Sequence, residues 1–152
     1  MHDSLDAAVL TLTRLARVFE RASAPLSLAD FRALSAIADG EGRASRLAQR
    51  LAVGKPSISA TVDSLSRRGF LERHGVEGDQ RARTLRVTDA GLAAYAAAQE
   101  RLRLEFSALA ALTGRPEDGV AWLAELGASI DAALDARATS GTEAQSTRVA
   151  RA

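Results

Sequence analysis

The sequence contains no cysteine among its 152 residues and only two histidines, His2 and His74. The absence of cysteine excludes disulfide bonds, thiolate metal sites and cysteine-based redox sensing, and it fits a reducing cytoplasm. Two histidines that lie so far apart do not predict a metal site. We therefore expect a protein without a metal ion or another cofactor.

Long apolar runs are also absent. No stretch approaches the roughly 20 apolar residues that a membrane span requires, and Asp3 and Asp6 occupy the region where a signal peptide carries basic residues. The sequence thus predicts a cytoplasmic protein with no membrane partner. Motifs such as G-x-S-x-G and H-E-x-x-H are missing as well. We therefore predict that the chain is not an enzyme.

Positive charge is concentrated in the middle of the chain. Residues 41–90 hold nine arginines and the single lysine against six acidic residues, whereas both flanking segments carry a small excess of acid. A basic unit of this kind favours a polyanion as its partner. The alternative is an ordinary solvated basic face. In either case, the flanking segments need a different role.

The flanking segments show apolar residues at helical spacing. They predict one helix over about 4–22 and two more over about 89–112 and 116–137. These stripes are longer than one small central unit can cover, which favours contact between two copies of the chain. The alternative is that they cover only their own core. The residues predicted to form a dimer interface are Leu5, Leu12, Leu15, Phe19, Leu109, Val120, Leu123, Ile130 and Leu134.

The central unit predicts a helix-turn-helix. After a capping box at Ser27, a helix is expected to end near Gly40, and a short extended piece near Arg43 can pair with a later strand. Short helices over about 45–52 and 56–68 then follow, separated by only three residues. Such spacing is typical of two short helices that cross steeply.

The second of these helices has two distinct faces. Ile58, Val62 and Leu65 share the inner face, while small and hydroxyl residues with a few charged ones occupy the outer face. Short side chains allow the backbone of a helix to approach another molecule closely. Two strands over about 71–74 and 84–87 are then expected to form a ribbon with a charged tip.

With the ribbon included, the sequence resembles the MarR family of winged helix-turn-helix transcriptional regulators. The matching segments are LAQRLAVGKPSISATVDSL over 47–65, RRGFLER over 67–73, and the wing signature that starts at Asp79 and ends at Gly91. The resemblance covers about residues 3–137 as a single domain. It implies a mainly α fold of six helices with a small antiparallel β-wing, here called the wing.

The resemblance also implies how the domain is divided. A winged helix-turn-helix lobe would span about 27–90, and dimerisation helices would span about 4–22 and 89–137. Residues 138–152 are small and polar without periodicity, which predicts a disordered tail. The implied activity is that of a homodimeric repressor that binds a palindromic operator in double-stranded DNA. A small apolar or aromatic ligand is the expected effector, with a constitutive repressor as the alternative.

Residue roles follow from this resemblance and from side-chain chemistry. Basic residues are expected at phosphates, hydroxyl residues at phosphates or base edges, and the wing arginines in the minor groove. The predicted DNA-binding residues are Arg46, Arg50, Lys55, Pro56, Ser57, Ser59, Ala60, Thr61, Ser64, Arg67, Arg73, Arg81 and Arg83. Many family members have arginine where this chain has Ala60, so one common contact is missing.

Asp63 is unusual on a face that approaches phosphates. We hypothesise that it pairs with Arg81 or Arg83 and ties the wing to the helix, together with Asp79. His74 is expected to be a surface or phosphate-facing residue. The sequence from Gly54 to Ser57 is similar to the end of a P-loop, but the earlier glycine is missing and a proline separates the lysine from the serine.

Aromatic residues make up only 4% of the chain. Trp122 and Tyr95 are expected to pack in the core of the long helices, with a ligand cavity as the alternative. Phe31 and Phe106 are weaker candidates for that cavity. A second functional class is a winged-helix module that docks a protein and does not bind DNA. The basic outer face separates the two classes, because a docking module has no need of it.

Overall fold

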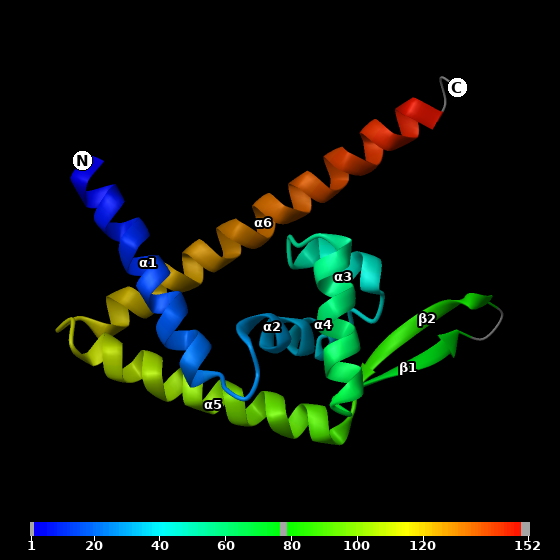
Figure 1. Ribbon diagram of the computed structural model, residues 1–152. Coiled ribbons are helices and arrows are strands. Elements are labelled where there is room, and N and C mark those ends of the chain that lie inside the picture. The colour runs from blue at the N-terminus through cyan, green and yellow to red at the C-terminus, as the bar shows by residue number, and fades with distance from the viewer. Residues whose placement is uncertain (1, 77–78, 150–152) are drawn as a thin grey trace.

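The computed structural model describes residues 2–76 and 79–149, with side chains except at residues 2, 76–83, 135 and 137–149. Figure 1 shows an open frame of three helices beside a compact lobe from which a two-stranded ribbon projects. The elements are α1 (His2–Ala22), α2 (Leu28–Ala38), α3 (Ala44–Arg50), α4 (Lys55–Arg67), β1 (Leu71–Val76), β2 (Asp79–Val87), α5 (Asp89–Ala111) and α6 (Pro116–Val149).

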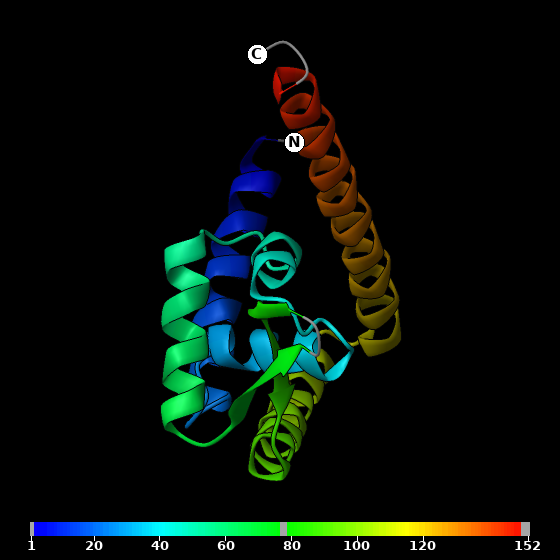
Figure 2. The same cartoon turned by 90° about the vertical axis from the view of Figure 1, so that its right-hand side faces the viewer.

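The frame consists of α1, α5 and α6. Helix α5 packs against both of the others, and α1 and α6 rise from it so that the two ends of the chain lie on the same side of the molecule (Figures 1 and 2). Helix α5 also contacts α2, and this contact joins the frame to the lobe. None of the described helices combines the length and the apolar character of a membrane span.

The lobe has a continuous apolar core beneath α4. Ile58, Val62 and Leu65 are at most 3% exposed, which confirms the inner face predicted from their spacing. They pack with apolar residues of α2, α3 and the two strands. The buried residues of this cluster are Leu26, Ala33, Leu34, Ala36, Ile37, Leu47, Ala48, Ile58, Val62, Leu65, Leu71, Leu85 and Ala98.

Helix α2 begins with the predicted capping box. The Ser27 hydroxyl accepts a hydrogen bond from the Asp30 amide at 3.0 Å, and the Asp30 carboxylate accepts one from the Ser27 amide at 3.1 Å. This reciprocal pair satisfies two N–H groups that the helix itself cannot. It also fixes the Asp30 carboxylate at a position where it is largely buried.

The wing is a two-stranded antiparallel sheet in which Leu71 is opposite Val87. Both strands are longer than predicted, since β1 ends at Val76 and β2 begins at Asp79. The extended piece near Arg43 does not become a third strand in the described chain. It contributes a single ladder-like bond, in which the Leu85 amide donates to the Gly42 carbonyl at 2.8 Å.

The structure differs from the prediction at the C-terminal end. Helix α6 continues to Val149, whereas residues 138–152 were expected to form a disordered tail. Residues 138–149 contain no proline and include alanine, glutamate and glutamine, which have high helix propensity. Polarity and lack of periodicity predict the absence of a buried face, but they do not by themselves prevent a helix. The predicted division into a lobe over about 27–90 and dimerisation helices over about 4–22 and 89–137 stays a prediction.

The turn between α3 and α4 contains a strained residue. Ala52 has a φ of 53°, which is unfavourable for any residue with a Cβ atom. We expect Ala52→Gly to raise the free energy of unfolding by about 1 kcal/mol in urea denaturation. Ala60→Gly, on the exposed face of α4, is the matched control and should lower it by about 1 kcal/mol. Equal losses in both variants would contradict the assignment of strain to Ala52.

Candidate nucleic-acid interface

The outer face of α4 is exposed and built from short side chains. Pro56, Ser57, Ser59 and Ala60 are all exposed on its first two turns. Thr61 and Ser64 lie at the border of this face and are partly buried, and the Thr61 hydroxyl donates back to the Ser57 carbonyl at 3.1 Å. The backbone of α4 is therefore open to close approach along the side that faces away from the core.

The N-terminal end of α4 lacks a side-chain cap. Gly54 is the N-cap residue, and Pro56 stands in the first turn, where its missing N–H costs nothing. The first N–H groups of a helix have no partner within the helix, and with the helix dipole they favour an anion. Lys55 is exposed at the same end. Both features favour a phosphate at this position.

Basic side chains surround this face. Arg46 on α3 and Arg67 at the end of α4 are exposed to solvent. Arg50 is also exposed and pairs with Asp39 at 3.2 Å. An exposed pair of this kind is weak, so phosphate can compete for the guanidinium.

Asp63 pairs with an arginine of the wing that differs from the predicted ones. Its carboxylate accepts a hydrogen bond from the Arg73 guanidinium on β1, and both side chains are about half exposed. Arg73 thus joins α4 to the wing, and the predicted pairing of Asp63 with Arg81 or Arg83 stays a prediction. The side chains of Asp79, Arg81 and Arg83 lie outside the described residues, so their predicted roles stay predictions.

Arg73 stands on the face of β1 that turns toward α4, because residues that alternate along a strand point to opposite faces. Leu71 on the same face is buried in the core. Glu72 and His74 share the outer face of the strand, where the His74 Nε2 lies 2.7 Å from a Glu72 carboxylate oxygen. The expectation that His74 is a surface residue agrees with its position.

The frame exposes much of the apolar stripe predicted to form the dimer interface. Leu5 is 61% exposed and Leu12 is 47% exposed on α1, while Val120 and Ile130 on α6 are each 50% exposed. The remaining residues of the predicted set are only partly buried: Leu15, Phe19, Leu109, Leu123 and Leu134. Contiguous apolar surface of this extent is typical of an interaction site.

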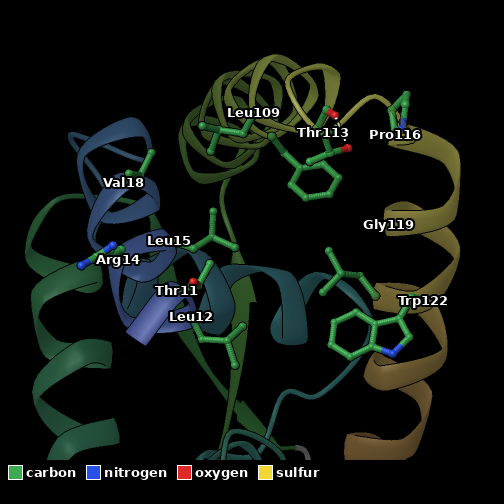
Figure 3. A pocket seen from close by; sticks show the side chains of 13 residues that line it. Thr11, Leu12, Arg14, Leu15, Val18, Leu109, Thr113, Pro116, Gly119 and Trp122 are labelled. Atoms are coloured by element: carbon green, nitrogen blue, oxygen red, sulfur yellow. Dashed lines mark hydrogen bonds between the residues drawn. The ribbon is translucent and has the colours of Figure 1, made fainter. Parts of the chain in front are cut away.

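A cavity of about 530 Å³ opens between the three helices of the frame. Figure 3 shows Leu12 and Leu15 from α1 facing Trp122 from α6 across it, with Leu109 from α5 above them in this view. Trp122 is 57% exposed, so the expectation that it packs in the core is wrong.

Tyr95 does pack against the lobe. Its ring stacks on Phe31 with centroids 5.0 Å apart, and its hydroxyl lies 3.3 Å from the Ser35 hydroxyl. This stack lies where α5 meets α2. It therefore contributes to the contact between the frame and the lobe.

Two arginines have contacts that sequence patterns did not indicate. Arg68 turns inward from the end of α4 and binds Asp30 and the Pro25 carbonyl. Arg101 on α5 donates to carbonyl groups at the end of α1. Their partners lie 38 to 79 residues away in sequence, and only the tertiary fold brings these groups together.

Comparison with known proteins finds one matching family. The model of the MarR family matches residues 24–82, which include the whole helix-turn-helix and most of the wing. The transcriptional repressor CouR, solved with a 23-mer DNA duplex, is 27% identical over 82% of this chain and 89% of its own, with a TM-score of 0.72. Residues 24–82 thus match the MarR family, and the chain as a whole has the fold of MarR regulators.

Other solved structures have the same fold. Wild-type MarR from E. coli is 19% identical with a TM-score of 0.66, and it matches over 82% of this chain and 94% of its own. BldR from Sulfolobus solfataricus is 23% identical with a TM-score of 0.68, over 83% and 94% respectively. No curated protein sequence matches.

These matches identify the chain as a DNA-binding transcription regulator and not an enzyme. Its six helices and antiparallel wing confirm the predicted fold class. The exposed face of α4 described above is thus the candidate DNA-reading surface of a winged helix.

Proposed function

We propose that this chain acts in the cytoplasm as a homodimeric repressor that binds a palindromic operator. The observation that carries the proposal is the outer face of α4, where short side chains are exposed and basic residues surround them. A helix with such a face fits the major groove of double-stranded DNA. CouR, the relative described as a repressor, was solved on a DNA duplex.

In this proposal the exposed residues of the lobe have two roles. The hydroxyl groups of Ser57, Ser59 and Ser64 contact base edges or phosphates. Phosphates are bound by basic side chains, which give affinity without sequence information. The basic residues that bind phosphates in this proposal are Arg46, Arg50, Lys55, Arg67 and Arg73. The wing residues Arg81 and Arg83 enter the adjacent minor groove.

The exposed stripe of the frame supports the homodimer. Solvated leucine, valine and tryptophan side chains on α1 and α6 are unfavourable for a monomer, and a second copy removes them from water. Two copies would then present two α4 helices to successive major grooves. Half-sites about 10 base pairs apart follow from the pitch of DNA.

An effector that releases the repressor is part of the proposal. CouR was also solved with p-coumaroyl-CoA, and it matches this chain at 27% identity with a TM-score of 0.67. By analogy, a small apolar or aromatic acid-like compound is the class of effector that we propose.

Salt dependence tests the proposed DNA binding. We expect affinity for operator DNA to fall about 1000-fold between 50 and 200 mM salt, because phosphate contacts release counterions. The measurement is fluorescence anisotropy with a labelled duplex that was selected from genomic fragments. An affinity that does not change with salt would instead favour a winged-helix module that docks a protein.

Removal of the Asp63 carboxylate tests the tie between α4 and the wing. Asp63→Ala should weaken operator binding about fivefold, because Arg73 and the wing lose their fixed position against α4. Asp39→Ala is the matched control, since it also removes an exposed acid that pairs with an arginine. This control should bind as tightly as the wild type or tighter. Tighter binding by Asp63→Ala would show that the acid is only repulsive.

A further inference from the structure

The chain passes from the frame to the lobe through a short junction, residues 23–27. Ser23 and Leu26 are at most 1% exposed, whereas Ala24 and Pro25 between them are exposed, so two buried side chains anchor a connection that has no regular structure. The Ser23 hydroxyl donates to the Leu26 carbonyl at 2.8 Å and also lies 3.1 Å from the Glu20 carbonyl. The junction is therefore a packed element with a defined shape.

The frame holds this junction through Arg101 of α5. Its Nε donates to the Ala22 carbonyl at 3.0 Å, and its Nη2 lies 2.7 Å from the Ala24 carbonyl and 3.4 Å from the Ser23 carbonyl. The Ala22 carbonyl belongs to the last turn of α1, where a helix leaves its acceptors without partners, and the other two carbonyls belong to the junction. One guanidinium thus joins α5, α1 and the start of the junction.

The lobe holds the next carbonyl through Arg68, the C-cap residue of α4. Its Nη2 donates to the Pro25 carbonyl at 3.0 Å, and its Nη1 donates to the Asp30 carboxylate at 3.0 Å. The guanidinium also lies over the ring of Phe70, 4.7 Å from the centroid. The side chain of Asp30 is only 11% exposed, so this pair is better shielded from solvent than the other ion pairs of the lobe.

Four successive carbonyl groups are therefore held by two arginines, one from the frame and one from the lobe. Arg101 binds the carbonyls of residues 22 to 24, and Arg68 binds that of Pro25. We propose that Arg68 is a positioning residue that sets the angle of α4 relative to the dimerisation helices. In a dimer it would thereby set the distance between the two DNA-reading helices. This inference rests on the proposed function.

The size of the effect follows from the length of α4. The helix has 13 residues, so it is about 20 Å long. A tilt of about 10° around its Arg68 end would move its other end by roughly 3.5 Å, which is close to the rise of one base pair of DNA. A loose junction would therefore allow the dimer to fit operators whose half-sites are one base pair too close or too far apart.

Arg68→Gln removes the positive charge and the two guanidinium N–H groups that bind the Pro25 carbonyl and the Asp30 carboxylate. Arg67→Gln, at the neighbouring exposed position, is the matched control. We expect wild type to bind operators with one base pair added or removed between the half-sites at least about 10-fold more weakly than the native spacing. Arg68→Gln should reduce this ratio to about threefold or less. Arg67→Gln should lower the affinity for all spacings by a common factor and leave the ratio unchanged, because it loses only a phosphate contact.

A second readout needs no DNA. The chain has no cysteine, so Ser57→Cys on α4 and Ser107→Cys on α5 allow two spin labels to be placed in one chain. Excess unlabelled chain ensures that a dimer carries only one labelled copy, so that the measured distance is the one between the two labels of that copy. We expect a narrow distribution of this distance when Arg68 is unchanged. The distribution should become at least twofold wider after Arg68→Gln and should not widen after Arg67→Gln. Arg68→Lys, which keeps the charge but loses the fork, should be intermediate and serves if the glutamine variant does not fold.

The two readouts separate this inference from the proposed function. An unchanged distance distribution in a folded Arg68 variant would overturn the positioning role, and so would an unchanged spacing ratio. If the wild type does not bind DNA at all, the proposed function is refuted. If the distance distribution nevertheless widens only after the Arg68 change, the positioning role of Arg68 still holds.

Discussion

Ala60→Glu is expected to reduce operator affinity at least about 100-fold without unfolding the protein. Ala60 is exposed in the middle of the face of α4 that we propose enters the major groove. A glutamate there would bring a carboxylate among phosphates and fill the space that the short side chain leaves for the bases. Glutamate has a high helix propensity, so α4 itself should form normally. Anisotropy of a labelled operator measures the loss.

The control for this experiment is Ala93→Glu. Ala93 is an exposed alanine on α5, so the substitution makes the same chemical change at the surface of a helix outside the proposed interface. We expect its operator affinity to stay within about threefold of wild type. If both variants lost affinity equally, net charge would explain the effect and α4 would have no special role.

Leu12→Asp is expected to convert the dimer into a monomer at micromolar concentration. Leu12 is half exposed on α1 and borders the cavity between the frame helices, so a second copy is expected to cover it. Burial of an unpaired carboxylate in such an interface costs several kcal/mol. Sedimentation velocity should show the monomer mass. Operator affinity should fall more than about 100-fold as well, because two half-sites no longer act together.

Thr13→Asp provides the comparison for the interface. Thr13 follows Leu12 directly and is exposed, but it points about 100° away around the helix. We expect this variant to remain a dimer with a dissociation constant within about tenfold of wild type. A Leu12→Asp protein that sediments as a dimer would contradict the assignment of this stripe to the interface.

The sequence predicted most of the fold because the local signals agree with one another. The Ser27 capping box, the inner stripe of Ile58, Val62 and Leu65, and the helix-starting Pro56 all stand where the pattern placed them. Each depends on residues that are close in sequence. The resemblance to a known family then gave the wing its place beside α4.

Contacts over long sequence distances could not be predicted in this way. The wing sequence offers Asp63 several arginines as partners, and only the fold shows that Arg73 stands on the side of β1 that faces α4. The role of Arg68 was hidden for a related reason. It follows the exposed Arg67 directly in sequence, and only the packing of α4 against α2 brings its side chain to Asp30.

The cavity and the length of α6 show a different limit. Apolar spacing on α1 and α6 predicted a buried stripe, yet it does not say whether the chain itself or a second copy covers that stripe. In one chain the stripe remains open, and Trp122 is exposed at the cavity as a result. Helix propensity, which continues beyond the last apolar position, accounts for the longer α6.

The central claim is that α4 reads DNA as one of a pair. Selection of bound fragments from sheared genomic DNA, followed by sequencing, tests it most directly. We predict enrichment of a palindrome whose half-site centres lie about 10 base pairs apart, and we expect this enrichment to be lost with Ala60→Glu. Fragments enriched without any common palindrome, or an equal enrichment by the Ala60→Glu protein, would contradict the claim.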